Sequence, residues 1–261
     1  MPMEWSHILV KQDHDQLTIT MNRPERRNAL SRGHIDELKI AFEQAADSDA
    51  RGIILAAAGS VFSSGHDFAD MVDADTDEVR SLLISCTELM QLIHEVPQVV
   101  LAGVHALATA AGCQLVAACD LAIASESARF AAPGGKAGLF CTTPMVEIAR
   151  NIGRKRAVEL SFTGSTIDAA TAAEWGLVNY VVPDAELDQA ARDFLSRATR
   201  GSAASKALGK RALYHQLDRS QADAYPYAID EMARASQIGD AKEGIRAFIE
   251  KRRPSWYQRR P

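Results

Sequence analysis

The sequence predicts an α/β protein with buried strands, followed by an all-helical C-terminal region. Short continuous apolar runs, such as "GIILAAAG" at 52–59, alternate with segments of helical period up to about Pro183. Glycine or proline ends several of these segments, which is typical of element boundaries. After Asp184 every segment has helical character. We therefore expect a core over residues 1–195 and a helical region over 196–261.

The first half of the chain supplies the clearest element signals. Two short strands are expected within residues 7–21, around a polar turn at 12–16. Apolar side chains recur at helical spacing over 32–46 and again over 76–96, where Pro97 stops the second helix. A buried strand is expected at 52–59. The polar segment "SVFSSGHDF" that follows it is expected to be a loop.

The second half continues the alternation of strands and helices. Asp168 is expected to cap a short helix that Gly176 ends. The other expected elements are a strand at 98–104, an alanine-rich helix at 110–119, two short strands within 120–133, a helical segment from Val146 to Gly164 and a strand at 177–183.

Composition excludes several classes of protein. A formal charge of −5 argues against nucleic acid as the main partner, because phosphate binding needs a basic surface. The uncharged run over 96–119 raises the possibility of a membrane span. Pro97, Gln98, His105 and Gln114 interrupt that run, however, so a buried strand, turn and helix explain it better.

The cysteines and the first residues of the chain suggest a cytoplasmic protein. None of the four cysteines forms a C-x-x-C pair, so we expect reduced core residues at Cys86, Cys113, Cys119 and Cys141. No signal-peptide pattern is visible in the first residues. The basic residues at 251–253 and 259–260 are either a solvated tail or an anchor for a small phosphate-bearing ligand.

Several motifs together resemble the crotonase (enoyl-CoA hydratase/isomerase) superfamily. They are "MNRPERRNALS", "VFSSGHDFADM", "AGCQLVAACDLAIASESARFAAPGGKAGL", "FTGSTIDAATAAEWGLVNYVVP" and "EGIRAFIEKRRPSW", and they keep the family's order. The phrases "ATAAGCQLVA", "GLFCTTP" and "KRRPSW" look most like the branch called enoyl-CoA hydratase domain-containing proteins. The resemblance implies a spiral ββα core with a C-terminal trimerisation region. It also implies trimers or hexamers, a coenzyme A thioester as ligand, and no metal or redox cofactor.

The resemblance places an oxyanion hole at two backbone N–H groups, those of His66 and Ala111. Fixed backbone donors suit an oxygen that becomes enolate-like, because they are aimed before the reaction starts. The helix that begins near Ala111 adds positive potential. His66 stands where the family usually has alanine, and we expect a partly exposed side chain without a catalytic proton. Asp67 is expected to brace this loop.

The same resemblance implies that both acid–base positions are altered. The two glutamates that hold water and exchange its proton in the family correspond to Gln114 and Gly134. Glutamine can orient water but cannot exchange a proton at neutral pH, and glycine has no side chain. Hydration by the usual route should therefore be severely impaired. The nearby titratable groups that could substitute are Cys141, Lys136, His105, His66 and Glu147.

Two of these substitutes have specific expectations. We expect Glu147 to face solvent or an arginine such as Arg150. Cys141 matches the loop that borders the acyl pocket in the family. As a nucleophile it would need an activating neighbour, and buried packing is the simpler interpretation.

Coenzyme A contacts are expected by resemblance at ten positions, although each arginine among them could equally be a solvated surface charge. These positions are Arg26, Arg27, Ala29, Ser64, Gly65, Asp67, Phe68, Gly112, Phe248 and Lys251. The last two match a pair that reaches the ligand of a neighbouring subunit. The sequence thus favours an acyl-CoA-binding hydratase-family member, nominally in fatty-acid metabolism. The open alternatives are an inactive acyl-CoA-binding or regulatory protein and another acyl-CoA isomerase or decarboxylase.

Overall fold

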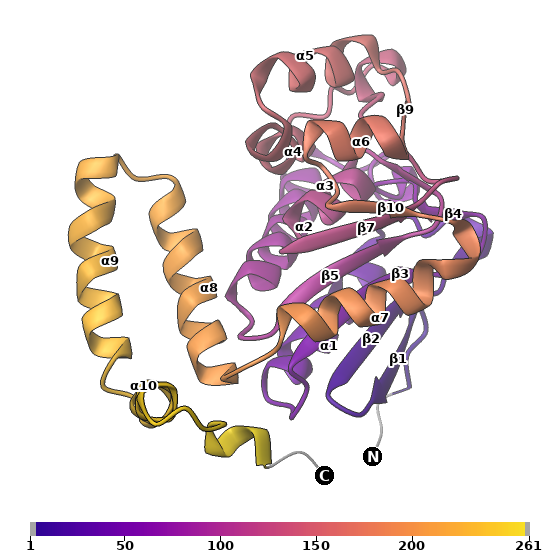
Figure 1. Cartoon of the computed structure of the whole chain (residues 1–261). Coiled ribbons are helices and arrows are strands. Elements are labelled where there is room, and N and C mark those ends of the chain that lie inside the picture. Colours follow the sequence, from indigo (N-terminus) through magenta and orange to yellow (C-terminus); the bar gives the residue numbers. More distant parts are fainter. Residues whose placement is uncertain (1–3, 259–261) are drawn as a thin grey trace.

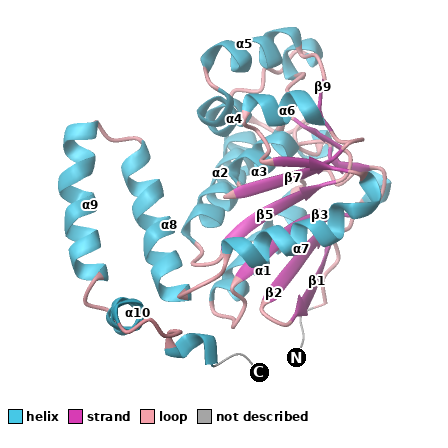
Figure 2. Cartoon of the chain, in the orientation of Figure 1, coloured by secondary structure: helices cyan, strands magenta, loops and turns pink. Residues whose placement is uncertain are grey.

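A computed structural model describes residues 4–258 and confirms the predicted α/β class (Figures 1 and 2). Its larger sheet has six strands, of which β1 and β2 form an antiparallel hairpin and all other neighbours are parallel. In spatial order these strands are β1 (Ile8–Asp13), β2 (Gln16–Met21), β3 (Gly52–Ala57), β5 (Val99–Val104), β7 (Leu121–Ser125) and β10 (Tyr180–Val182).

A second, smaller sheet carries the segments that matter for function. Its strands are, in spatial order, β4 (Val61–Ser63), β6 (Leu107–Thr109), β8 (Arg129–Ala131) and β9 (Ile167–Asp168). The first three are parallel, and β9 runs antiparallel to β8. The carboxyl ends of β4, β6 and β8 therefore lie at one edge.

Helices cover both faces of the larger sheet (Figure 1). Helix α7 packs its Leu187 and Leu195 on Ile54, Leu101 and Ile123 of one face. The opposite face packs on the main core, which includes α1, α2 and α3. The helices are α1 (Arg32–Ala46), α2 (Thr76–Glu95), α3 (Ala111–Ala118), α4 (Pro144–Ile152), α5 (Arg154–Thr163), α6 (Ala169–Trp175), α7 (Leu187–Ala198), α8 (Ala203–Leu217), α9 (Gln221–Ala235) and α10 (Gly239–Ile249).

Most of the expected elements are present, with local differences. The Asp168 side chain accepts from Thr171 N at 2.8 Å and Gly176 ends α6 in the left-handed region, as predicted. The expected loop at 60–68 begins with strand β4, and β6 lies just before the expected helix at 110. Both strands are three residues long, too short to give a periodic signal. The helical segment from Val146 is broken at Gly153, whose φ is 78°.

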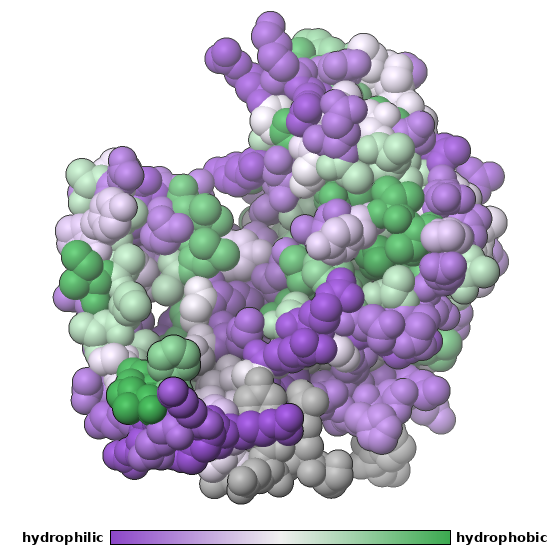
Figure 3. All heavy atoms as spheres, viewed as in Figure 1, coloured by the Kyte–Doolittle hydropathy of each residue, from purple (hydrophilic) through white to green (hydrophobic). Residues whose placement is uncertain are grey.

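Helices α9 and α10 stand away from the sheets, whereas α8 contacts α2 and β5, and the surface of these three helices is partly apolar (Figures 1 and 3). The exposed large apolar residues of α8–α10 are Leu213, Leu217, Tyr225, Ile229, Met232, Ile245, Phe248 and Ile249. The expected boundary between residues 195 and 196 falls inside α7, and the division into a core and a C-terminal region stays a prediction.

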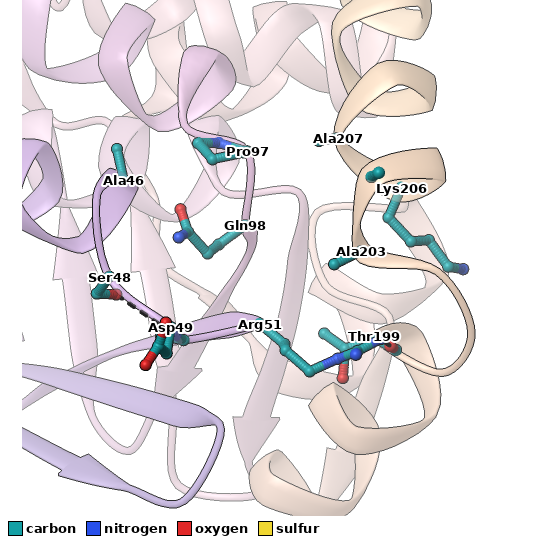
Figure 4. A pocket seen from close by; sticks show the side chains of 12 residues that line it. Ala46, Ser48, Asp49, Arg51, Pro97, Gln98, Thr199, Ala203, Lys206 and Ala207 are labelled. Carbon is teal, nitrogen blue, oxygen red and sulfur yellow. Dashed lines mark hydrogen bonds between the residues drawn. The ribbon is translucent and has the colours of Figure 1, made fainter. Parts of the chain in front are cut away.

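One arginine of the core, Arg51, extends toward Thr199 at the start of the C-terminal region (Figure 4). A cavity of about 350 Å³ lies at this junction. Arg51 Nη2 donates to the carbonyls of Thr199, at 2.8 Å, and Gly201. On the core side the Gln98 amide donates to Ala45 O at 2.6 Å. The cavity is thus part of a hydrogen-bonded joint between the start of α8 and the loops before β3 and β5.

The cysteines and most of the uncharged run over 96–119 are buried, as the sequence predicts. All four cysteines are free and buried. Among residues 4–258 no helix is long and apolar enough to cross a membrane. The run that opens at Val96 instead forms β5, β6 and α3, which are almost entirely buried.

One buried histidine gives a prediction about pH. His34 is fully buried in α1, and burial lowers its pKa from 6.5 to about 4. Arg23 and His7 lower it slightly further, and a hydrogen bond to Ala29 O and the Glu37 carboxylate oppose the shift. The unfolded chain binds this proton below pH 6.5 and the folded chain does not. Stability should therefore fall, by on the order of 3 kcal/mol, as the pH drops from about 6.5 to 4.

Urea unfolding at a series of pH values checks this expectation. His34→Asn should flatten the pH dependence between pH 6.5 and 4. His14→Asn should leave it unchanged, because the His14 side chain is 94% exposed. Equal slopes in wild type and His34→Asn would show that other groups cause the acid sensitivity.

Candidate active site

The parallel strands β4, β6 and β8 bring three loops to one edge of the smaller sheet. The loop after β4 contains His66, the turn after β6 leads into Ala111, and the loop after β8 contains Gly134. Sequence separation between these residues is large. The short strands alone place them together, because carboxyl ends of parallel neighbours meet at the same edge.

The loop after β4 is held so that the His66 N–H faces away from the neighbouring segment. Leu30 N donates to Gly65 O at 2.8 Å, and Asp67 N donates to Leu30 O at 3.3 Å. His66 lies between these two bonded residues and forms a parallel bridge with Leu30. The His66 N–H therefore points to the side away from Leu30. Within residues 4–258 the His66 N–H has no hydrogen-bond partner.

The second donor comes from the start of α3. Ala110 N donates to Ala131 O at 2.9 Å, and the Ala110 backbone has φ 51° and ψ −121°. A non-glycine residue in this region is strained, and such strain persists only where the surroundings enforce it. Ala111 then begins the helix. Its N–H has no partner in the described chain, as is usual in a first helical turn.

Two glycines allow these segments to approach closely. A Cβ added at Gly65 would lie 2.9 Å from Ala110 Cβ and 3.2 Å from Ala111 N. A Cβ added at Gly112 would lie 2.5 Å from Ser63 O. Neither position can hold a side chain without movement of the backbone. The glycines therefore fix the spacing between the two free N–H groups.

A cavity of about 110 Å³ opens at this edge, and a groove of about 320 Å³ lies beside it. The cavity wall includes His66, Ala111, Gly134 and Cys141, and its other side chains are apolar or carry only hydroxyl groups. The groove is lined by residues expected to contact coenzyme A, namely Arg26, Arg27, Ala29, Ser64, Asp67 and Phe68, together with Glu25 and His66. Ser64, His66 and Phe68 line both hollows, which are therefore adjacent.

The groove is organised by an ion-pair network that the sequence indicated only in part. As expected, Asp67 braces the loop, because its carboxylate accepts from Ala69 N at 3.2 Å and pairs with Arg23 and Arg26, each at 3.5 Å. Buried Asn28 donates to Ala58 O and Val61 O at 2.8 Å. Sequence reasoning missed Arg23 and Asn28, although both lie within the first family motif.

Gln114 lies in α3 but does not line the cavity. Its side chain is almost fully buried, and its Oε1 has no hydrogen-bond partner in the described chain. Thr109 Oγ1, just before the strained Ala110, is also buried and unpaired. Sequence reasoning did not single out Thr109. Unpaired buried polar atoms cost about 1–3 kcal/mol each and often mark functional sites.

Gly134 and Cys141 close the loop after β8 on itself. Leu139 N donates to Gly134 O at 3.0 Å, and Gly134 N donates to Cys141 Sγ at 3.3 Å. A Cβ at Gly134 would lie 2.1 Å from Leu139 O and 2.7 Å from Cys141 Sγ. Burial raises the pKa of the Cys141 thiol, so the sulfur is protonated at neutral pH. This agrees with buried packing rather than an activated nucleophile.

The remaining candidate groups lie outside the cavity. Lys136 and His105 do not line it, and His105 Nε2 lies 2.8 Å from Gly59 O. The expectation for Glu147 holds in part. Its side chain is only 19% exposed, and its Oε2 lies 3.9 Å from His94 Nε2, but the charge of Arg150 also acts on this carboxylate. Burial raises the Glu147 pKa.

The C-terminal positions lie away from both hollows. Phe248 and Lys251 line neither of them, and Phe248 is 85% exposed. In the basic end, Arg252 pairs with Glu243 and Glu250, both at 2.6 Å. Arg259 and Arg260 lie outside the described residues.

Comparison with known proteins decides the family. Residues 14–259 match the family model described as "Enoyl-CoA hydratase/isomerase". The chain belongs to this family. A Xenopus laevis relative named "Enoyl-CoA hydratase domain-containing protein 3, mitochondrial" is 41% identical over 250 residues, which cover 95% of this chain and 85% of the relative. A probable enoyl-CoA hydratase of Mycobacterium bovis is 31% identical and covers 98% and 100% of the two chains.

Solved structures of this enoyl-CoA hydratase/isomerase family share the whole fold. A Mycobacterium smegmatis enoyl-CoA hydratase superposes with a TM-score of 0.93 at 41% identity and covers 97% of this chain and 99% of its own. Human enoyl Coenzyme A hydratase domain-containing protein 3 gives 0.92 at 39% identity and covers 96% and 100%. These matches confirm the resemblance seen in the sequence, including its closeness to the domain-containing branch.

Proposed function

We propose that the protein binds an acyl-CoA thioester and stabilises the enolate form of its carbonyl with the N–H groups of His66 and Ala111. The observation that supports this most is the presence of two unpaired N–H groups at the edge where the cavity and the groove meet. Preorganised backbone donors stabilise a developing oxyanion without reorganisation. The coenzyme A moiety would lie along the groove beside Arg26 and Arg27, so the protein needs no separate cofactor.

In this proposal the standard hydration step is weak. Gly134 has no side chain, and Gln114 neither exchanges a proton nor reaches the cavity wall. None of the cavity-lining side chains from residues 4–258 is a carboxylate. A lyase or isomerase reaction in fatty-acid metabolism would therefore need another proton-transfer group. The lack of a carboxylate in the cavity lining also favours a second candidate, a catalytically inactive acyl-CoA-binding or regulatory protein. A decarboxylase remains a further option, because that chemistry needs fewer carboxylates.

Titration and turnover with crotonyl-CoA test this proposal. We expect binding in calorimetry, with hydration at least about 10²-fold slower than by a relative that has both glutamates. Gln114→Glu should raise hydration only weakly, because Gly134 still lacks its partner group. Hydration at the rate of ordinary family members would refute the argument from the missing carboxylates. Failure to bind any acyl-CoA would refute the proposed ligand.

We also propose that the protein is a homotrimer or hexamer. Its support is the set of exposed apolar residues on α8–α10, because such surfaces are typical of protein interfaces. In this arrangement Phe248 and Lys251 would contact the coenzyme A of a neighbouring subunit. The vertebrate relatives are named as mitochondrial proteins, and a cytoplasmic location for this chain stays a prediction.

A further inference from the structure

The acyl cavity extends away from the groove in which coenzyme A would lie. Ser64, His66 and Phe68 line both hollows, so they mark the end of the cavity at which the thioester enters. Most residues that line only the cavity come from two other places, the start of α2 with the loop before it and residues 139–144 after β8. A thioester held by the N–H groups of His66 and Ala111 would therefore direct its acyl chain toward these two walls.

The cavity is too small to enclose a long acyl chain. Its volume is about 110 Å³. An apolar cavity of about 150 Å³ in another protein holds one benzene molecule, which has six carbons. By this comparison a chain of about four carbons fills the cavity, and a longer chain must leave it.

The wall formed by residues 139 and 140 opens to solvent. Leu139 lines the cavity and is 54% exposed, and Phe140 lines it and is 36% exposed. Both side chains are apolar, so the rim of the cavity offers a hydrocarbon chain an apolar exit. A chain that passes this rim continues along the outer surface of the loop after β8.

The apolar surface continues from this rim onto α5. The rings of Phe140 and Phe162 meet edge to face, with their centroids 5.2 Å apart. Phe162 is 74% exposed, and Val158, one turn earlier on the same face of α5, is 47% exposed. Helix α5 contacts residues 134–137, so the loop and the helix form one surface. We call Leu139, Phe140, Phe162 and Val158 the apolar track.

We propose that the apolar track binds the distal part of the acyl chain, so that the protein prefers acyl-CoA esters with chains longer than about four carbons. The inference rests on the proposed function, because the thioester must be held at the inner end of the cavity. Among residues 4–258 no lysine, arginine or carboxylate lines the cavity, which fits a hydrocarbon chain rather than an acyl group with a second carboxylate. Exposed apolar patches that adjoin a cavity are typical of ligand-binding surfaces.

Calorimetry with butyryl-, octanoyl- and dodecanoyl-CoA, below micelle-forming concentrations, tests the proposal. Each methylene group that leaves water completely raises affinity about fourfold, and one that is covered on a single side raises it about twofold. Octanoyl-CoA has four more methylene groups than butyryl-CoA, so it should bind on the order of tenfold more tightly. Dodecanoyl-CoA should bind at least as tightly as octanoyl-CoA.

Three variants locate the chain. Phe162→Ser should weaken the binding of octanoyl-CoA at least about fourfold more than that of butyryl-CoA, because the shorter chain ends inside the cavity. Phe162→Leu keeps an apolar side chain and should retain most of the gain with chain length. Val72→Ser is the matched control, because Val72 is also 74% exposed and follows Met71, which lines the cavity. It should keep the wild-type dependence on chain length.

The outcomes separate this inference from the proposed function. If affinity does not rise beyond butyryl-CoA, or if Phe162→Ser keeps the full rise, the track is overturned while acyl-CoA binding stands. If Val72→Ser loses the rise instead, the chain leaves beside Met71 and the inference also fails. A change in oligomeric state of Phe162→Ser in light scattering would show that a second copy of the chain covers this surface, which overturns the inference. If wild type binds none of the three esters, the proposed function itself fails.

Discussion

Replacement of Lys210 by methionine is expected to lower the free energy of unfolding by about 3–5 kcal/mol, because it leaves a buried carboxylate without its cation. Lys210 Nζ lies 2.7 Å from Asp120 Oδ2, and their side chains are 7% and 13% exposed. The same ammonium donates to Ile93 O at 2.7 Å and to Gln98 O at 2.8 Å. Tyr214 and Val100 also donate to Asp120, so the carboxylate cannot turn to solvent.

Urea unfolding at fixed protein concentration measures this effect. Lys210→Met combined with Asp120→Asn should be less destabilised than Lys210→Met alone, because the unpaired charge is removed. Arg80→Met, which breaks the exposed pair with Asp77, should cost less than about 1 kcal/mol. A loss below 1 kcal/mol for Lys210→Met as well would mean that Asp120 is hydrated or protonated in the folded protein.

Gly112→Ala is expected to damage the proposed oxyanion hole. Its Cβ would lie 2.5 Å from Ser63 O and 2.6 Å from Ser63 Cβ, so α3 must move away from β4. The N–H of Ala111 would then move relative to that of His66. Loss of one hydrogen bond to the thioester carbonyl should weaken butyryl-CoA binding by up to about tenfold, and overpacking should cost about 1–3 kcal/mol of stability.

Calorimetry with a matched ligand isolates the carbonyl contact. The thioether butyl-CoA lacks the carbonyl oxygen, so its affinity should change less than that of butyryl-CoA. Gly209→Ala is the control variant, because Gly209 lies in α8 and an added Cβ meets nothing within 4 Å. If Gly112→Ala binds both ligands as wild type does, the N–H of Ala111 does not contact the carbonyl.

The sequence predicted most of the fold, because longer elements have a period that can be seen. Helix α2 and strand β5 followed directly from their apolar spacing and from Pro97 between them. Strands β4 and β6 were not expected, although they place the site. Each has three residues, and β6 lies in an apolar run without alternation. Such strands are defined by their neighbours rather than by their own residues.

The site was predicted in its residues but not in its contacts. The motifs singled out His66 and Ala111, and the structure brings both to one cavity. They could not show that the Gln114 side chain is off the cavity wall or that Glu147 turns toward His94, because both depend on how α3 and α4 pack.

The closed loop at Gly134 limits what this wall of the cavity can become. A Cβ at this position would lie 2.1 Å from Leu139 O and 2.7 Å from Cys141 Sγ, inside the loop that Cys141 helps to close. A carboxylate therefore cannot be installed here by one substitution, because residues 134–141 would have to move with it. Attempts to engineer an acid or base into this cavity need a redesigned loop and not a point mutation.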